Sequence, residues 1–395
     1  MIRYIIPPNW ISYDALSLMP ELTEAKAAVL SLTTIPFQRS WADKLQDMQL
    51  KREVAGTSRI EGAEFTESEL EAALKESAEQ FFTRSQRQAR AAKLTYQWIA
   101  LLPDDYPVNR DLILEVHRRI VTGADDDHCP PGRIRDKDQN VHFGTPRHRG
   151  AEGGEECAEV FAMLDSAIQH EFKAHDVLIQ ALALHYHFAA IHPFLDGNGR
   201  TARALEALFL QRAGLRDELF IAMSNYYYDE KIAYLSALSE SRASGHNLTP
   251  FLKFGLKGIS IQCNRLFSEI RKQVSKALFR NVMYDLFGRL ESTRKRVIAH
   301  RQLQLLKLLL EVDEIEFNSL WKRALPDYSS LKSPMNALAR DLNGLVHLGA
   351  INVRRQEKNQ VWTISLNLDW PTQITESQFF EQMKNLPKAK TYPFL

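Results

Sequence analysis

The sequence predicts a mainly α-helical protein, and three features lead to this prediction. Apolar residues recur every three or four positions through most of the chain up to about residue 290. Glycine and proline gather in residues 124–155, and strand-like runs occur only there and near the C-terminus. With 395 residues, the chain is long enough for two or three domains. We therefore expect helices throughout, one short hairpin and a small β-containing domain at the end.

Residues 1–100 are expected to form an N-terminal helical region. Apolar side chains three and four apart predict a helix over Ser40–Val54. Thr66 and Glu69 have the spacing of a capping box, which predicts that a further helix begins there and continues toward Ala78.

Residues 101–290 are expected to form the central helical domain. Asn109 is suited to cap a helix that Gly123 ends. The following glycine- and proline-rich segment interrupts the helices, and Ile134, Val141 and Phe143 within it predict a short hairpin. The helices predicted after it are Glu156–His170, Val177–Ile191, Gly199–Arg212, Asp229–Ser244 and one opened by Pro250.

Residues 291–395 are expected to form a separate domain, with the boundary near residue 290 in the charged run Glu291–Arg296. Periodicity predicts helices at 297–310, 316–324 and 330–347. Two β-like runs follow, Ala350–Arg354 and Val361–Leu366. Three helices and a two-stranded wing are typical of a winged helix-turn-helix domain.

The partner of the winged helix stays open at this point. The stretch from Arg296 to Asp369 carries ten Lys/Arg against eight Asp/Glu, whereas DNA-reading domains usually present a more basic surface. Protein docking or formation of a homodimer is therefore slightly favoured. DNA binding through the helix 330–347 is the alternative.

Bulk composition narrows the class of protein further. The formal net charge of +1 gives no overall attraction to nucleic acid or anionic membrane. The three cysteines lie far apart, without disulfide or metal-knuckle spacing. No apolar run approaches the roughly 20 residues of a membrane span, and Pro7 and Pro8 interrupt the N-terminus where a signal peptide would be apolar. We expect a cytoplasmic protein without a membrane partner.

The chemistry is concentrated in residues 192–203, His-Pro-Phe-Leu-Asp-Gly-Asn-Gly-Arg-Thr-Ala-Arg. Gly197 and Gly199 allow a tight loop whose N–H groups can converge on an anion, and the next helix adds the positive end of its dipole. Arg200 and Arg203 lie three apart on that helix, so we expect both guanidinium groups to reach the same anion.

Two further side chains in this stretch suit chemistry on phosphates. Asp196 stands beside the expected phosphate site, where a Mg²⁺ ion needs a carboxylate. His192 opens the loop, and its near-neutral pKa suits it to accept a proton from an attacking hydroxyl. These residues alone suggest metal-assisted phosphoryl or nucleotidyl transfer, although a glycine-rich loop can also be only a turn.

Residues 192–203 resemble the signature of the Fic family, HxFx[DE]GNGRxxR, and every specified position is filled. Glu115–Gly123 followed by residues 131–135 (PGRIR) is similar to the helix that leads into the family's target-docking flap. Tyr234–Leu238 and Leu248–Phe251 resemble its closing helices. The resemblance covers roughly residues 1–290 and implies a Fic helical core with a small β-hairpin flap.

The resemblance implies a protein adenylyltransferase, which uses Mg²⁺ and moves AMP from ATP to a hydroxyl of a target protein or of itself. It implies that His192 is the general base, that Asp196 holds Mg²⁺, that Phe194 anchors the loop and that residues 133–145 form the flap. Arg203 would bind the γ-phosphate, and Tyr234 would lie near the adenine. The full set implied to bind the nucleotide is Gly197, Asn198, Gly199, Arg200, Thr201, Arg203 and Tyr234.

Residues 57–62 (TSRIEG) resemble the family's inhibitory motif, [ST]xxxE[GN]. The resemblance implies that Glu61 pairs with Arg203 and keeps the γ-phosphate from binding productively. A carboxylate that competes with phosphate for one arginine is a sound switch, because the pair must break before the anion enters. In relatives the same glutamate can support removal of AMP, which stays open here.

Other interpretations were weighed beside this one. A DNA-binding regulator whose Fic core only senses nucleotide is the rival from another class, and transfer of UMP or GMP is the rival within the family. The aspartates at 125–127 are expected to be a solvated loop. His185 and His187 are expected to pack in the core or to support the site rather than to bind a metal.

Overall fold

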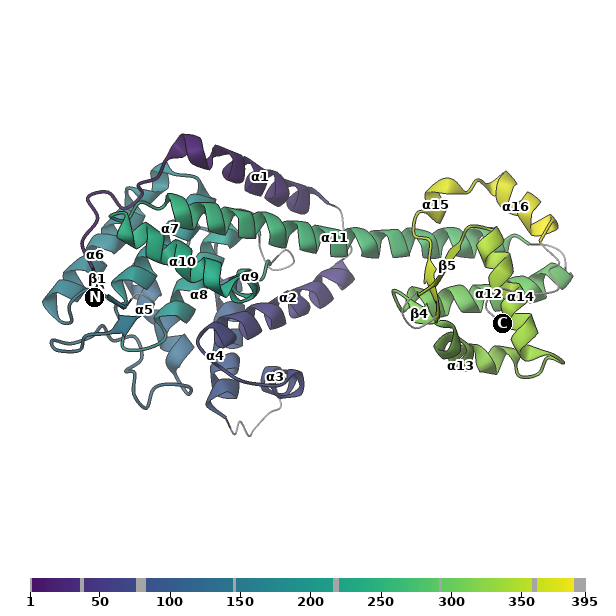
Figure 1. Cartoon of the computed structure of the whole chain (residues 1–395), viewed down its shortest axis with the longest axis horizontal. Coiled ribbons are helices and arrows are strands. Elements are labelled where there is room, and N and C mark those ends of the chain that lie inside the picture. The colour runs from purple at the N-terminus through teal and green to yellow at the C-terminus, as the bar shows by residue number, and fades with distance from the viewer. Residues whose placement is uncertain are drawn as a thin grey trace. The chain divides into compact units, whose positions relative to one another are not determined.

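We analysed a computed structural model, which describes residues 2–35, 39–75, 83–144, 147–215, 220–290, 293–356 and 361–386. The chain forms two compact units, Met1–Ser268 and Glu269–Leu395 (Figure 1). The division falls inside one helix, α11 (Thr249–Gly288), whereas the sequence suggested a boundary near residue 290. The mainly α-helical architecture with small antiparallel hairpins is as expected.

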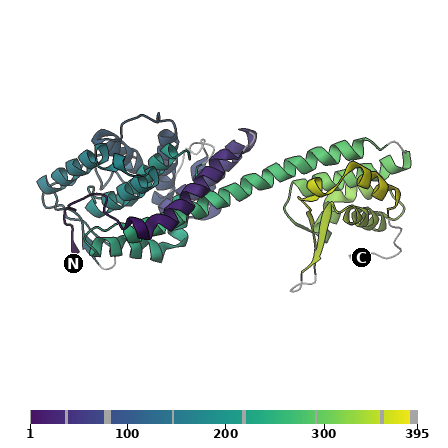
Figure 2. The same ribbon diagram turned by 90° about the horizontal axis from the view of Figure 1, so that it is seen from above.

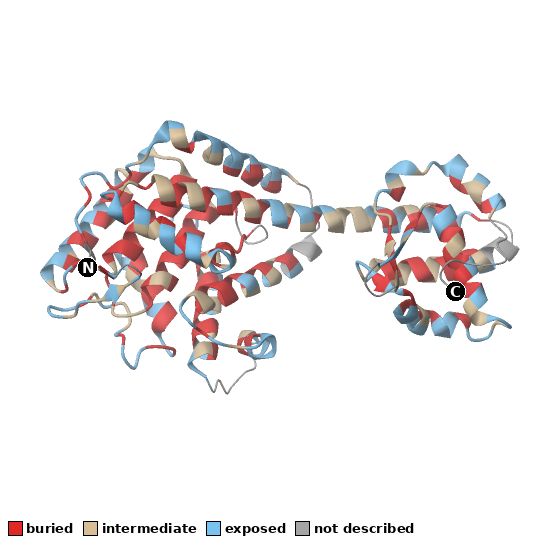
Figure 3. Ribbon diagram, in the orientation of Figure 1, coloured by how far each residue is buried: buried red, intermediate tan, exposed pale blue. Residues whose placement is uncertain are grey.

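The centre of the first unit is a pair of helices that carry the motif between them. Helix α7 (Val177–Ile191) ends directly before the motif loop, and α8 (Asn198–Arg212) begins within it. Almost every residue of both helices is buried (Figure 3). A helix that is apolar on all sides belongs in a core, and α7 meets this description. The loop is therefore held between two rigid elements.

The helices around this pair follow the predicted pattern. Asn109 caps α5 (Arg110–Val121) through its side-chain oxygen, as predicted, and the predicted helix 229–244 is α10, preceded by a separate short helix. The surrounding helices are α4 (Arg84–Ala100), α6 (Glu155–Gln169), α9 (Met223–Asp229) and α10 (Lys231–Ala243). None of the helices in the described ranges is both long and apolar enough to cross a membrane.

The N-terminal helices pack on the same unit. Helix α1 (Ala15–Thr34) lies beside the first part of α11 in both views (Figures 1 and 2), where Glu24 bonds Ser260. The predicted helix 40–54 lies within the longer α2 (Arg39–Ile60). The predicted capping box is confirmed at the start of α3 (Glu67–Leu74), while Ala78 lies outside the described residues.

A small sheet lies over the motif loop. Strands β2 (His142–Phe143) and β3 (His148–Arg149) are antiparallel, and β1 (Ile2–Arg3) adds to β3 in parallel, which gives the order β1-β3-β2. Of the three residues that predicted this hairpin, only Phe143 lies in a strand. Strand β2 is an edge strand, so one side of its backbone is free to pair with a further strand.

The second unit has its own core, which contains buried residues from the C-terminal part of α11, from the helices that follow it and from a three-stranded antiparallel sheet of order β4-β6-β5. Its predicted helices and strands are present, and the short strand β4 and two C-terminal helices were not predicted. The elements are α12 (Thr293–Leu310), β4 (Ile315–Glu316), α13 (Phe317–Tyr328), α14 (Pro334–His347), β5 (Ile351–Arg355), β6 (Trp362–Leu366), α15 (Trp370–Gln373) and α16 (Glu376–Lys384).

Candidate active site

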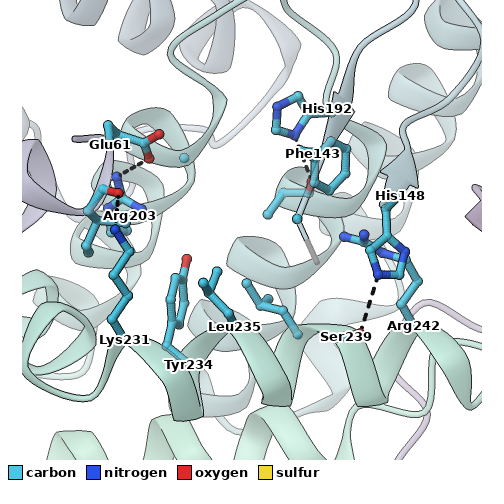
Figure 4. Close-up of a pocket in the computed structure, with 15 residues that line it drawn as sticks. Glu61, Phe143, His148, His192, Arg203, Lys231, Tyr234, Leu235, Ser239 and Arg242 are labelled. Atoms are coloured by element: carbon cyan, nitrogen blue, oxygen red, sulfur yellow. Dashed lines mark hydrogen bonds and ion pairs between the residues drawn. The ribbon is translucent and has the colours of Figure 1, made fainter. Parts of the chain in front are cut away.

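A cavity of about 260 Å³ lies between the β1-β3-β2 sheet (the flap sheet), the motif loop and α10 (Figure 4). Glu61, Arg203 and Lys231 stand at one end of it, and His148 and Arg242 stand at the other. The complete lining is Ile60, Glu61, Phe143, Gly144, His148, Ala189, His192, Gly199, Arg203, Lys231, Tyr234, Leu235, Leu238, Ser239 and Arg242.

His192 faces this cavity from the end of α7, with a left-handed backbone (φ 56, ψ 59). Its Nδ1 donates a hydrogen bond to the carbonyl of Ala189 at 3.0 Å, which leaves the lone pair of Nε2 free to accept a proton. The ring stacks on Phe143 of β2 with centroids 4.0 Å apart. Loss of hydration lowers the pKa of His192 to about 4, so the imidazole is neutral near pH 7. These are the properties of a general base.

The shape of the motif loop is set by buried contacts. Phe194 is fully buried and stacks on His117 with centroids 3.6 Å apart. The Asn198 side chain accepts from the backbone N–H of Phe194 at 2.9 Å and donates to its carbonyl at 2.8 Å. Gly197 takes a positive φ of 73°, which suits a residue without a side chain. Phe194 thus anchors the loop as expected, and the Asn198 side chain folds the loop rather than facing the cavity.

The first turn of α8 brings an anion-binding end to the cavity. Gly199 of this turn lines the cavity. The first backbone N–H groups of a helix have no partner within the helix, so they can donate to an anion in the cavity. Thr201 also lies in this turn, but its side chain is fully buried behind the cavity lining. We therefore expect a phosphate to meet the backbone of this turn, and Arg203 one turn further on.

Arg203 is held by Thr57 of α2 and by Glu61, which directly follows this helix. Its Nη2 lies 2.7 Å from Glu61 Oε1, and its Nε donates to the Thr57 hydroxyl at 2.8 Å. Desolvation acts to raise the pKa of Glu61, but the charge and the hydrogen bond of Arg203, together with the charges of Arg200 and His192, outweigh it and lower this pKa. A Cβ on Gly199 would lie only 2.2 Å from Glu61 Oε1. The Glu61 carboxylate therefore sits directly over the turn that is suited to bind phosphate.

The end of α2 explains how Glu61 reaches this place. Ala63 N–H donates to the carbonyl of Ser58 and Gly62 N–H to that of Arg59, which is the Schellman pattern of a helix C-terminus. Gly62 takes the left-handed position with φ 90. Lys231 Nζ also donates to the carbonyl of Ile60 at 3.0 Å. The chain therefore turns sharply after Glu61 and leaves its side chain projecting toward Arg203.

Tyr234 forms part of the cavity wall, as its predicted role requires. Its hydroxyl hydrogen bonds His185 Nε2 at 2.9 Å, and His185 Nδ1 contacts the buried carboxylate of Glu206. Tyr227 donates to the same carboxylate at 2.8 Å. Burial raises the pKa of Tyr234 to about 12, so the hydroxyl stays protonated. His185 thus supports the cavity wall, in line with its expected packing role.

Arg200 behaves differently from the expectation that it shares an anion with Arg203. Its guanidinium, only 1% exposed, pairs with Asp125 at 2.6 Å and with Asp196 at 3.2 Å, and it does not line the cavity. The expectation of a solvated loop is wrong for Asp125, which is fully buried and also accepts from Arg84 and Gln88. A buried cation needs a partner, and Asp125 supplies it.

Asp196 has the donor chemistry for Mg²⁺, but its oxygens are engaged. Oδ1 accepts from the Gly197 N–H at 2.5 Å and from Arg200, while Oδ2 accepts from Arg84 at 3.0 Å and His128 at 2.9 Å. The Arg84 and His128 side chains are 52% and 41% exposed and can turn into solvent. The residues therefore fit a hard cation at Oδ2 once these two side chains move aside.

Among the cavity residues that the sequence analysis missed are His148 and Arg242. The Arg242 guanidinium lies over the Phe143 ring at 4.7 Å, and no carboxylate of the described ranges pairs with it. Its Nε and the Nδ1 of buried His148 have no hydrogen-bond partner in the structure described. Neither residue belongs to the 192–203 motif, so only the fold brings them to the site.

Part of this chain is similar to known proteins. The model of the Fic/DOC family matches residues 107–210. The chain is 31% identical over 160 residues to protein adenylyltransferase fic-1 of Caenorhabditis briggsae, covering 40% of this chain and 28% of that protein. It is 34% identical over 125 residues to protein adenylyltransferase Fic of Drosophila willistoni, covering 31% and 24%. The chain thus spans less than three tenths of the length of these relatives.

Two solved structures share the fold. A Fic family protein from Desulfovibrio desulfuricans superposes with a TM-score of 0.56 at 18% identity, covering 93% of this chain and 98% of that one. Fic-1 from Caenorhabditis elegans superposes with a TM-score of 0.53 at 21% identity, covering 66% and 74%. At these identities the likeness concerns the fold.

Proposed function

Residues 107–210 of this chain match the model of the Fic/DOC family, and from this match we propose that the protein transfers AMP from ATP to a hydroxyl of a protein target or of itself. The observation that carries the proposal is the free Nε2 of His192, which faces a cavity bordered by Arg203 and the first turn of α8. Curated relatives named as protein adenylyltransferases support the choice of reaction.

In the proposed reaction the target hydroxyl oxygen attacks the α-phosphorus of ATP. Its proton passes to Nε2 of His192, the bond between the α- and β-phosphates breaks, and pyrophosphate leaves. The backbone N–H of Gly199 and the Arg203 guanidinium would stabilise the negative charge on the phosphates in the transition state. Such electrostatic stabilisation is usually the largest contribution to catalysis of phosphoryl and nucleotidyl transfer. Tyr234 would border the adenosine. Arg200 would act at a distance, by fixing Asp125 and Asp196.

Asp196 would hold Mg²⁺ through Oδ2. The ion, when bound, would neutralise charge on the phosphates. In the structure this oxygen accepts from Arg84 and His128, so metal and cationic side chains would compete for it. The roles of His192 and Arg203 follow from their own geometry and do not depend on that competition.

We propose that Glu61 inhibits the enzyme. Its carboxylate occupies Arg203 and covers Gly199, so a γ-phosphate would meet a negative charge where it needs a positive one. Glu61→Gly should therefore bind ATP about tenfold more tightly than the parent protein, a difference of about 1.4 kcal/mol. Glu64, three residues away and exposed, provides the matched control Glu64→Gly.

The activity itself is tested with ATP that carries the label on the α- or on the γ-phosphorus. Incubation with the Glu61→Gly protein should transfer only the α label, and excess unlabelled ATP should compete better than GTP or UTP. Transfer of the γ label would overturn the proposal in favour of phosphoryl transfer. Better competition by GTP or UTP would reassign the nucleotide donor.

We propose that the second unit docks a protein or a second copy of this chain. Arg340 is the only Lys or Arg in α14, the helix that a DNA-binding winged helix would insert into the major groove. Its neighbour Asp341 is buried and pairs with Arg301. A helix with one cation offers little for a phosphate backbone, so DNA binding is the less supported alternative.

A further inference from the structure

Arg135 is a buried cation with an unusual set of partners. Its side chain is 2% exposed, and no carboxylate within the described residues lies at salt-bridge distance from it. Burial lowers the pKa of its guanidinium. Leaving a cation in the interior without a carboxylate is unfavourable unless other groups satisfy its donors. The contacts of Arg135 therefore point to a specific role.

The donors of Arg135 bond to backbone carbonyls of three separate segments. Nε donates to the carbonyl of His192 at 2.8 Å, and Nη2 donates to that of Ala151 at 2.6 Å. Nη1 donates to the carbonyl of Gln139. Gln139 precedes β2 and Ala151 follows β3, so one guanidinium joins both ends of the flap hairpin to the catalytic loop.

Backbone bonds tighten the same junction. Arg135 N–H donates to the carbonyl of Pro193 at 3.0 Å, and Ala151 N–H donates to that of Ile191 at 3.0 Å. The residue before Ala151 is Gly150, and the junction leaves no room for a side chain there, because a Cβ would lie 2.5 Å from the Ile191 carbonyl oxygen. Residues 191–193 are thus bonded on both sides by the base of the flap.

The bond to the His192 carbonyl bears directly on the imidazole. His192 has a left-handed backbone, which is unfavourable for a residue with a side chain and persists only when its surroundings fix it. Arg135 holds the carbonyl of that residue, and so fixes the ψ angle on which the loop's course depends. The ring itself stacks on Phe143 of the flap.

We propose that Arg135 is a positioning residue that couples the flap to His192. Arg135 bonds both the backbone of His192 and the residues just before strand β2, which carries Phe143. A target segment that docks on β2 would therefore place its hydroxyl in a fixed position relative to the imidazole of His192. This inference rests on the proposed nucleotidyl transfer. Arg135 does not line the cavity, so it acts through the backbone that it holds.

The test compares Arg135→Met and Arg135→Lys in the Glu61→Gly background. Arg135→Met should lower kcat for AMP transfer about 100-fold, the scale expected for a misplacement of about 1 Å, while ATP affinity changes less than about twofold. Arg135→Lys, which can hold one carbonyl, should recover part of kcat. The control is Arg119→Met, which removes an exposed arginine paired with Glu115 and should change neither value.

NMR of ¹³C,¹⁵N-labelled histidine rings provides a readout independent of activity. The His192 signals, assigned by their loss in His192→Ala, should report the Nδ1–H tautomer in the parent and in Arg119→Met. They should shift toward a mixture of tautomers in Arg135→Met. Unchanged His192 signals with unchanged kcat would overturn the inference. If the Glu61→Gly parent transfers no AMP, the proposed reaction fails, whereas the ring signals still decide whether Arg135 positions His192.

Discussion

At the scale of single residues, the protonation of His192 decides whether the site can act as a base. The bond from Nδ1 to the Ala189 carbonyl selects the tautomer with a free Nε2. Because dehydration disfavours the charged ring, the pKa lies at about 4, below the ordinary value near 6.5. The imidazole therefore keeps its lone pair down to acidic pH.

This shift predicts the pH dependence of transfer. The neutral base is lost only as pH falls through its pKa, so kcat/KM of the Glu61→Gly protein should stay flat from pH 8 to about 5 and fall near 4. Removal of Glu61 also removes a charge that raises the pKa of His192, which moves the fall lower still. A pH–rate profile with its midpoint near 6.5 would contradict this account.

The contacts of Asp196 predict the metal dependence. Arg84 is a cation that occupies Oδ2 at 3.0 Å, so its removal should make this oxygen more available. We expect Arg84→Ala to lower the Mg²⁺ concentration that gives half-maximal activity by up to about fivefold, which corresponds to an exposed ion pair of up to about 1 kcal/mol. This concentration is measured by recording AMP transfer at increasing Mg²⁺ concentrations for the parent protein and for Arg84→Ala. A higher Mg²⁺ requirement would show that Arg84 supports the site rather than competing in it.

At the scale of elements, the proposed inhibitory contact between Glu61 and Arg203 depends on how α2 ends and packs. Gly56 brings the helix so close to α9 that a Cβ would lie 2.4 Å from the backbone of Ser224. Glu53 of the same helix accepts from the backbone of Ser224 at 2.7 Å and from the Tyr96 hydroxyl. These contacts fix the axis of α2, and the turn at Gly62 then sets the direction of Glu61.

This arrangement predicts a partial release of the inhibition by Gly62→Ala. A side chain at φ 90 strains the turn, with a cost of about 1–2 kcal/mol, and the strain should loosen the contact between Glu61 and Arg203. We expect a lower midpoint of thermal unfolding together with faster AMP transfer. The matched control is Gly245→Ala, which has φ 69 and equally free space but lies in another loop. Equal activation by both variants would contradict the assignment.

The sequence predicted the elements whose signals are local. The capping box at Thr66, the cap at Asn109 and the bounds of α7 all depend on neighbouring residues, and the structure agrees with them. The pairing of β1 with β3, in contrast, joins residues 2–3 to residues 148–149. A contact between segments so far apart in the sequence cannot be predicted from local patterns.

The same reason explains which site residues were missed. The motif supplied His192, Arg203 and the loop, because they are adjacent along the chain. The burial of Asp125 and the carbonyl contacts of Arg135 arise only when distant segments meet. Charged residues in a loop rich in glycine and aspartate give no sequence signal that distinguishes a buried partner from a solvated one.

At the scale of the whole molecule, the charge distribution bears on the second unit. The chain as a whole is nearly neutral, and α14 presents a single arginine. Association with DNA gains most of its strength from contacts with phosphates, which need clustered cations. The whole 395-residue chain should therefore bind random DNA more weakly than about 10 µM at 0.15 M salt, as measured by fluorescence anisotropy. Nanomolar binding with a steep salt dependence would favour the alternative, a DNA-binding regulator, over the proposed transferase.

The central claim joins two features of the cavity, a base at His192 and a phosphate site that Glu61 blocks. Its most direct test is the intact mass of the purified Glu61→Gly protein after incubation with Mg²⁺ and ATP, beside the Glu61→Gly/His192→Ala double variant. The account predicts an added AMP on the single variant and none on the double variant. An AMP adduct that persists without His192 would contradict the assigned base, and the absence of any adduct on the single variant, even with candidate target peptides added, would contradict the proposed transfer.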